Sequence, residues 1–248
     1  MTTDEQPLKS DPARQHPPFT GTLFLVGTPI GHPDDLSIRA IETLRRADII
    51  ACEERKEAQR LLRRHGISSE LFEINEHTER DAADEVVAAL RRGAIVALIS
   101  DCGMPVFADP GSRVVRRALD AGLDVRAVPG PTSLTTALAV SGMDVTRFYF
   151  HGFPSPKRPE RRAELRALKS HPSVLVFLDA PYRLTQLLAD AVEAFGSRRR
   201  ACVACDLTLE TELVRRGTLA SLHSFFLQHP GKREFVVMVE GFNTRGPQ

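Results

Sequence analysis

The sequence predicts an α/β protein built from two domains. Short, unbroken apolar runs such as residues 22–27 and 94–99 alternate with segments of helical periodicity. This alternation is typical of parallel strands that are covered by helices. A length of 248 residues allows one large or two small domains. The pattern of elements changes near residues 140–150, which leaves two halves that are each large enough for a core of their own.

The first half alternates strands and helices throughout. Each predicted strand is a short apolar run, and the helices at 54–64 and 83–92 are closed by Gly66 and Gly93. A Pro-Gly-Pro turn precedes the last helix. We expect strands at residues 22–27, 48–52, 71–74, 94–99 and 124–128, and helices at 35–46, 54–64, 83–92, 114–121 and 134–140.

The second half has a different order, with strands at 147–153, 174–178, 201–205 and 235–239, and helices at 160–169 and 184–195. We therefore expect a domain at 21–145, a second domain at 146–242 and a short tail at 243–248. Residues 1–20 hold four prolines and no apolar run, so they predict a disordered tail and not a signal peptide. No stretch approaches the ~20 apolar residues that span a bilayer, which predicts a cytoplasmic protein without a membrane partner.

The charge differs between the halves although the whole chain carries only +1. That total excludes a polycation that coats nucleic acid. Residues 1–150 carry −4 and residues 151–248 carry +5. Arg158, Arg162 and Arg166 share one face of a predicted helix. This face is either a solvated surface or a contact for RNA phosphates.

Several common motifs are missing or unconvincing. The turn at 27–32 imitates a dinucleotide-binding loop, but its glycine spacing is wrong and Pro29 lacks the N–H that a pyrophosphate needs. A P-loop is absent, and the eight histidines lack ligand spacing, so we expect no metal site. Cys202 and Cys205 lie three apart in a predicted strand. Their side chains should therefore point to opposite faces, which favours core cysteines over a redox pair.

Two loops indicate a site for a small molecule. Residues 100–111 follow the most apolar strand and are dense in Gly, Pro and Asp, and residues 129–133 (PGPTS) follow another strand. Ligands of open α/β sheets bind at the carboxyl ends of the strands. The Thr132 and Ser133 hydroxyls and the N–H groups of the following helix suit a carboxylate or a ribose.

The order of motifs resembles the tetrapyrrole methylase superfamily. These motifs are V-G-T-P-I-G, C-E-x-R, S-D-x-G-x-P-x-x-x-D-P-G, P-G-P-T-S, G-F-x-P and P-Y-R, over roughly residues 22–241. The resemblance implies two α/β domains with S-adenosylmethionine in the cleft between them, usually in a homodimer. Within the superfamily, the sequence is similar to a branch that methylates a cytidine ribose 2′-hydroxyl in ribosomal RNA of the small subunit. The resemblance therefore implies that the partner is this RNA or the small ribosomal subunit.

The resemblance also implies site residues. Contacts to the cofactor would come from Pro29, Ser100, Asp101, Cys102, Gly103, Val106, Thr132 and Ser133. Phe177, Leu178 and Cys205 are added by approximate position only, and a place in the apolar core is the stronger alternative for these three. The candidates that orient RNA or assist deprotonation are Arg183, Glu53, Arg55, Glu76 and His77, each of which has ordinary surface charge as its alternative.

The sequence departs from that branch mainly on the presumed substrate side. Cys52-Glu53-Glu54-Arg55-Lys56 replaces C-E-D-T-R, Asn75-Glu76-His77-Thr78 replaces H-E-H-N, and Asp179-Ala180-Pro181-Tyr182-Arg183 replaces E-S-P-H-R. Cys102 and Met104 also alter S-D-A-G-T-P. Two alternatives therefore stay open: a methyltransferase for another RNA or a tetrapyrrole-like small molecule, and a non-catalytic relative that binds cofactor or RNA.

Overall fold

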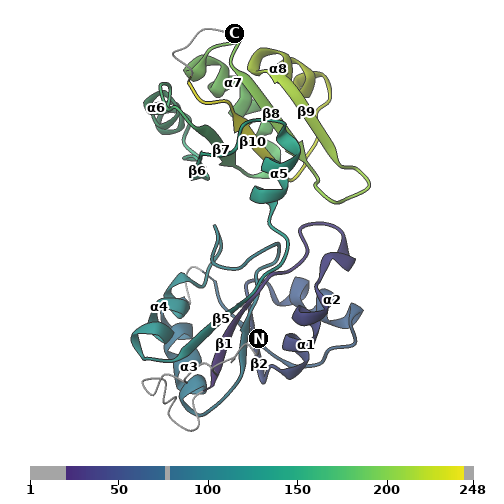
Figure 1. Cartoon of the computed structure of the whole chain (residues 1–248), viewed down its shortest axis with the longest axis vertical. Coiled ribbons are helices and arrows are strands. Elements are labelled where there is room, and N and C mark those ends of the chain that lie inside the picture. The colour runs from purple at the N-terminus through teal and green to yellow at the C-terminus, as the bar shows by residue number, and fades with distance from the viewer. Residues whose placement is uncertain (1–20, 76–78, 243–248) are drawn as a thin grey trace, which may run out of the picture.

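The computed structural model describes residues 21–75 and 79–242, which form two α/β lobes stacked along the long axis of the molecule (Figure 1). Each lobe is built around a five-stranded sheet. The predicted α/β class and its division into two parts are confirmed.

The first lobe holds an all-parallel sheet in the order β3-β2-β4-β1-β5. Helices α1 and α2 cover one face, and α3 and α4 cover the other, because the three central strands are apolar on both sides. The elements of this lobe are β1 (Thr22–Val26), α1 (Ile38–Arg46), β2 (Ile49–Cys52), α2 (Arg55–Arg64), β3 (Glu70–Glu73), α3 (Glu79–Arg91), β4 (Val96–Leu98), α4 (Ser112–Asp120) and β5 (Asp124–Val128).

The second lobe holds a mixed sheet in the order β6-β7-β10-β8-β9, in which only β6 and β7 are parallel. Helices α6, α7 and α8 pack on one face, and α5 packs on the other. Its elements are α5 (Ser133–Ser141), β6 (Phe148–Gly152), α6 (Arg158–Ala167), β7 (Val174–Leu178), α7 (Leu184–Phe195), β8 (Arg200–Cys205), β9 (Leu213–Thr218), α8 (Leu219–Gln228) and β10 (Phe235–Val239).

The chain crosses between the sheets immediately before α5. Leu134 and Leu138 of α5 pack against Val176 of β7 and Ala204 of β8. The crossing therefore lies at residues 129–132, earlier than the expected boundary at residue 145. Whether residues 21–145 and 146–242 fold as separate domains stays a prediction.

Among the strands and α-helices of the described residues, β9 and α8 were not predicted. β9 is an edge strand with two exposed arginines in its middle, so it lacks the apolar run that marks the other strands. α8 begins with a reciprocal cap, in which the Thr218 hydroxyl accepts from the Ser221 N–H at 3.2 Å and the Ser221 hydroxyl accepts from the Thr218 N–H at 3.0 Å. This Thr-x-x-Ser pattern was the signal for its start.

The prediction for Cys202 and Cys205 is confirmed. Cys202 packs in the core under α5, whereas Cys205 packs in the core under α7 and α8. Both are free thiols and fully buried.

The arginines of α6 bind α7 instead of forming an open basic face. Arg161 is 1% exposed and donates to Asp190 Oδ2 from Nε (2.9 Å) and Nη2 (2.8 Å). Arg158 Nε donates to Asp190 Oδ1 at 3.0 Å. Arg162 and Arg166 both pair with Glu193. Arg158, Arg162 and Arg166 thus share one face of α6 as predicted, but carboxylates of α7 already pair with them.

Among the described residues, every helix is too short or too polar to cross a membrane.

Candidate active site

Three loops meet at the carboxyl edge of the first sheet. They follow β1, β4 and β5, which are neighbours in the sheet, so their ends lie side by side. The Gly27 N–H donates to the Val128 carbonyl at 3.0 Å, and the Thr28 N–H donates to the Gly103 carbonyl at 2.8 Å. The loops that the sequence singled out are therefore joined by backbone hydrogen bonds.

Thr28 holds two of these loops together through its side chain. It is 1% exposed, and its hydroxyl lies 3.1 Å from the Ser100 carbonyl and 3.2 Å from the Gly103 carbonyl. The Ser100 hydroxyl also donates to the Gly103 carbonyl at 3.2 Å. The turn at 100–103 is thus fixed from both sides.

Thr28→Val is expected to lower the free energy of unfolding by about 1–2 kcal/mol, because it keeps the shape but removes a buried donor. Urea titration measures the change. Thr43→Val is the matched control, since its hydroxyl bonds the Arg39 carbonyl at 2.8 Å on the exposed side of α1. We expect the control to change stability by less than ~0.5 kcal/mol; equal losses in the two variants would contradict the role of Thr28.

Glycines permit the closest approach between the loops. A Cβ on Gly27 would lie 2.7 Å from the Cα and N of Gly130 and 2.8 Å from Met104 Sδ. A Cβ on Gly130 would lie 2.9 Å from the Gly27 backbone. Only hydrogen fits at either position.

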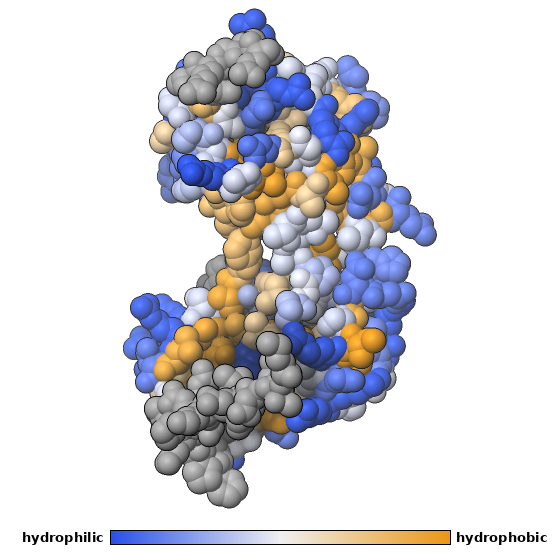
Figure 2. Space-filling view, viewed as in Figure 1, coloured by the Kyte–Doolittle hydropathy of each residue, from blue (hydrophilic) through white to orange (hydrophobic). Residues whose placement is uncertain are grey.

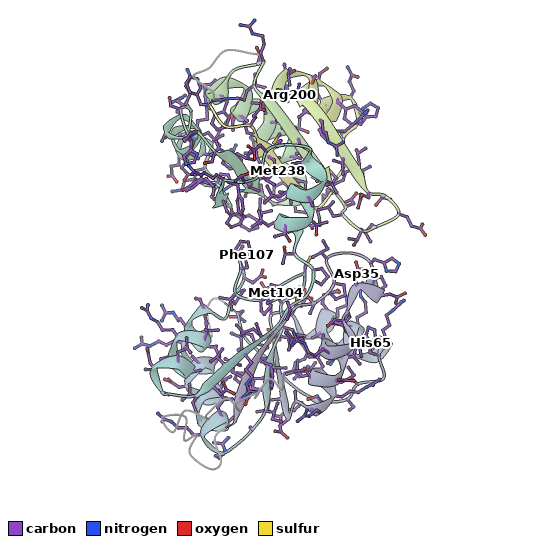
Figure 3. The ribbon with its side chains drawn as sticks, viewed as in Figure 1. Asp35, His65, Met104, Phe107, Arg200 and Met238 are labelled. Carbon is purple, nitrogen blue, oxygen red and sulfur yellow. The ribbon has the colours of Figure 1, made fainter. Side chains whose placement is uncertain are left out.

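The loop after β4 has an unusual backbone. Val106 and Ala108 adopt positive φ values of 74° and 69°. A β-branched residue such as Val106 rarely takes this conformation, and strained residues of this kind cluster at functional sites. Phe107 lies between them and packs against Phe150 of β6, with ring centroids 4.7 Å apart and ring planes tilted by 31°. Figure 3 shows Phe107 and Met104 between the two lobes.

A cavity of about 240 Å³ lies between the lobes; we call it the interlobe cavity. Hydrophobic residues gather where the lobes face each other (Figure 2). The first lobe contributes Ile30, Cys102, Phe107, Ala108 and Asp109, the start of α5 contributes Thr132, Ser133 and Leu134, and the second lobe contributes, among others, Leu178, Asp179, Ala204, Leu207, Glu234 and Val236.

The start of α5 presents polar groups to this cavity. Thr132 is the N-cap, and its hydroxyl oxygen accepts from the Thr135 N–H at 3.2 Å. Ser133 is the first residue of the helix. At the other end of α5, the Arg216 guanidinium of β9 donates to the Val140 and Ser141 carbonyls. Both ends of this helix are therefore held in place.

Acidic groups line the same cavity. Burial raises the pKa of Asp109 to about 6, although the Ser100 hydroxyl opposes the shift. Burial also raises the pKa of Glu234. Asp179 Oδ1 accepts from its own neighbour, the Ala180 N–H, at 2.8 Å, whereas Asp179 Oδ2 is buried without a hydrogen-bond partner among the described residues.

Asp109→Asn is expected to change the pH dependence of stability. The folded protein keeps a proton on Asp109 between about pH 4 and 6, where the unfolded chain has lost it. The wild type therefore loses stability as pH rises through this window, and the loss is complete above pH 6. We expect roughly 1 kcal/mol after solvent screening. Urea titrations from pH 4 to 7 measure the difference between the two proteins; a constant difference would contradict the prediction.

The structure brings only some of the predicted cofactor residues to the interlobe cavity. Cys102, Thr132, Ser133 and Leu178 line it. Pro29, Ser100 and Asp101 instead line a second cavity beside α2, together with Cys102. Gly103 and Val106 lie in the loop between these positions without lining either cavity, and Gly103 forms the bonds to Thr28.

The side chains of Phe177 and Cys205 point away from the interlobe cavity. Both belong to the core under α7 and α8 and are at most 1% exposed. Their strand neighbours Leu178 and Ala204 line the cavity instead. Because side chains alternate along a strand, Phe177 and Cys205 lie on the opposite face of the sheet, as the alternative of a core position predicts for them.

The predicted substrate-side residues are spread over both lobes. Arg55 begins α2 and donates to the Leu71 carbonyl at 2.9 Å, and Glu53 is half-buried just before this helix. Arg183 lies next to the interlobe cavity and donates to Asp179 Oδ1 at 3.3 Å and to the Tyr182 hydroxyl at 3.2 Å. Glu76 and His77 lie outside the described residues.

Sequence reasoning missed Ile30, Asp109, Leu207 and Glu234. Ile30 belongs to the motif V-G-T-P-I-G and Asp109 to the motif S-D-x-G-x-P-x-x-x-D-P-G. The signal for both was therefore their place in a loop that the sequence had already assigned to the site. Leu207 and Glu234 flank the ends of β8 and β10, and only the antiparallel pairing of these strands brings them together.

Two α/β lobes, each built on a five-stranded sheet, place this chain in a fold class that several solved methyltransferases share. The structure resembles diphthine synthase (TM-score 0.70, 16% identity, 89% of this chain and 90% of that one). It also resembles uroporphyrin-III-C-methyltransferase from Thermus thermophilus (TM-score 0.61, 22% identity, 89% and 94%).

The chain belongs to the tetrapyrrole (corrin/porphyrin) methylase family, whose model matches residues 22–223, and it is a methyltransferase. It is 40% identical over 226 residues to "Ribosomal RNA small subunit methyltransferase I" of Pseudomonas aeruginosa, covering 90% of this chain and 80% of that protein. The protein of the same name from Thermotoga maritima is 37% identical over 221 residues, covering 89% and 99%. The family predicted from the motifs is confirmed.

Proposed function

We propose that this chain transfers a methyl group from S-adenosylmethionine to the 2′-hydroxyl of a cytidine in ribosomal RNA of the small subunit. The observation that carries this proposal is the similarity to relatives named "Ribosomal RNA small subunit methyltransferase I", at 35–42% identity over about nine tenths of the chain. Such similarity extends over both lobes and all three loops, so it concerns the whole site and not one motif.

We further propose that the interlobe cavity holds the cofactor, and its residues fit this group. Leu178, Ala204 and Val236 form an apolar wall suited to an adenine ring. The start of α5 suits the carboxylate of the methionine part. Asp179 Oδ2, which is buried and unpartnered, suits an amino or hydroxyl donor. When bound, the cofactor supplies an electrophilic methyl group on a positively charged sulfur.

The protein's own part is then to bind, orient and exclude water. Arg183 is positioned for this, since its guanidinium donates to the Tyr182 hydroxyl and to Asp179, and these two groups raise its pKa. We propose that Arg183 orients RNA beside the cavity and favours loss of the hydroxyl proton. Glu53, Arg55, Glu76 and His77 stay proposals as contacts to RNA.

We also propose that the chain forms a homodimer, as is usual for the family. Edge strand β6 supports this proposal, because Phe148 and Tyr149 are 43% and 41% exposed on it. Sedimentation velocity tests the assembly; a monomer at micromolar concentration would overturn it.

The reaction is tested with small ribosomal subunits from a strain that lacks this modification. Purified protein and methyl-labelled S-adenosylmethionine should place label in the small-subunit RNA, and mass spectrometry should find it in a 2′-O-methylated cytidine. Subunits from the parent strain, which are already methylated, are the control. Label that enters only another RNA or a small molecule would favour the alternative substrates, and cofactor binding without any transfer would favour a non-catalytic relative.

A further inference from the structure

A second cavity lies directly beside the interlobe cavity. It measures about 460 Å³ and is formed by the loops after β1 and β4 together with one side of α2. We call it the α2 cavity. None of the roles described above accounts for its lining on α2.

The two cavities share a wall. Ile30 and Cys102 line both of them. The Cys102 thiol lies 3.7 Å from the Ile30 carbonyl, so these residues contact each other where the cavities meet. The two cavities therefore adjoin at these residues, which is where a molecule in the α2 cavity comes nearest to one in the interlobe cavity.

The lining of the α2 cavity combines an apolar surface with charges of both signs. Pro29, Leu61 and Ile99 supply the apolar part. Two carboxylates, Asp101 and Glu57, also line the cavity. Burial is the main cause that raises the pKa of Asp101, and one of its oxygens accepts from the Glu54 N–H at 3.2 Å.

Arginines stand at the rim. Arg60 pairs with Glu57 at 3.3 Å and has a side chain that is 81% exposed. Arg64 pairs with Asp34 at 2.8 Å and is 50% exposed. Surface pairs of this kind contribute little to stability, so an incoming anion can replace the carboxylate at small cost.

We propose that the α2 cavity receives the nucleotide that is to be methylated, taken out of its stack. This inference rests on the proposed function. An unstacked base packs on apolar side chains and is recognised at its edges. The exocyclic amino group of cytosine donates to carboxylates, which matches Asp101 and Glu57. Arg60 and Arg64 suit the flanking phosphates, and the ribose then lies toward Ile30 and Cys102, next to the cofactor.

A binding experiment tests the site without turnover. Cytidine 5′-monophosphate is titrated into protein with labelled Ile and Leu methyl groups, and NMR follows Ile30, Leu61 and Ile99. We expect these three signals to shift together. UMP, which lacks the amino donor, should bind several-fold more weakly. The absence of any shift of these signals up to about 10 mM nucleotide would overturn the site.

Variants of α2 test the site with full-length RNA in the small subunit. Arg60→Glu is expected to raise the KM for subunits at least tenfold and to leave the affinity for S-adenosylhomocysteine unchanged. Arg63→Glu is the matched control, because it makes the same charge change on the side of α2 that faces away from this cavity. Equal effects of the two variants would contradict the proposal.

Leu61→Trp fills the cavity and should abolish both the CMP-induced shifts and methylation, whereas Leu61→Met should keep both. Circular dichroism and binding of S-adenosylhomocysteine report whether each variant is folded. If the wild type labels the RNA but Leu61→Trp labels it equally well, the cavity assignment is wrong and the proposed function stands. If the wild type labels no RNA, the proposed function itself fails.

Discussion

Replacing Asp190 by alanine is expected to lower the free energy of unfolding by about 3–5 kcal/mol. Asp190 is fully buried. Its Oδ2 accepts hydrogen bonds from both Nε and Nη2 of the buried Arg161 guanidinium. Removal of the carboxylate leaves a buried cation without its counter-charge. Arg161 also donates to the Ser155 and Pro156 carbonyls, so the loop before α6 loses its support as well. Denaturant titration measures the loss.

Two further variants identify the cause of that loss. Glu193→Ala removes the neighbouring carboxylate on α7, which is 43% exposed, and should cost less than ~1 kcal/mol. Combining Asp190→Leu with Arg161→Met removes both charges and should recover most of the stability. If the double variant is as unstable as Asp190→Ala, lost packing and not the uncompensated charge is responsible.

Gly27→Ala is expected to weaken binding of S-adenosylmethionine by about 100-fold, equivalent to ~2.7 kcal/mol. The new methyl group cannot fit between the Gly130 backbone and Met104, so the loops after β1 and β5 must separate. That movement displaces Ile30 on one side and Thr132 on the other side of the interlobe cavity. Calorimetric titration of the cofactor measures the effect.

Gly231→Ala is the matched control for that experiment. A Cβ at Gly231 meets no atom within 4 Å. We expect unchanged cofactor affinity for the control and unchanged helix content for both variants. Retention of full affinity by Gly27→Ala would show that the close contact of the loops does not shape the cavity.

Much of the architecture could be predicted because the first lobe follows simple rules. Its central strands β1, β2 and β4 are continuous apolar runs and its helices are amphipathic, so the two kinds of element are easily distinguished. β9 escaped because its exposed arginines interrupt the apolar pattern, and α8 escaped because its cap uses Ser221 in place of an acidic residue.

The lining of the interlobe cavity was predictable where a loop directly follows a clearly marked strand, and not where strands of the second lobe supply it. Cys102, Thr132 and Ser133 follow strands that the sequence marks clearly. For the second lobe, the choice between Leu178 and Phe177, or between Ala204 and Cys205, depends on which face of the sheet α5 covers. β7 and β8 are apolar on both faces, so periodicity alone cannot make that choice.

The link between the lobes has a thermodynamic consequence. Residues 129–131 contain two prolines, whose φ angles are fixed, and Gly130 between them is held against Gly27. Such a link has few conformations to lose. The loss of entropy that comes from fixing α5 against the loops of the first lobe therefore occurs during folding, before a ligand binds. The interlobe cavity is thus preorganised. A larger part of the free energy of the ligand's contacts then contributes to its affinity.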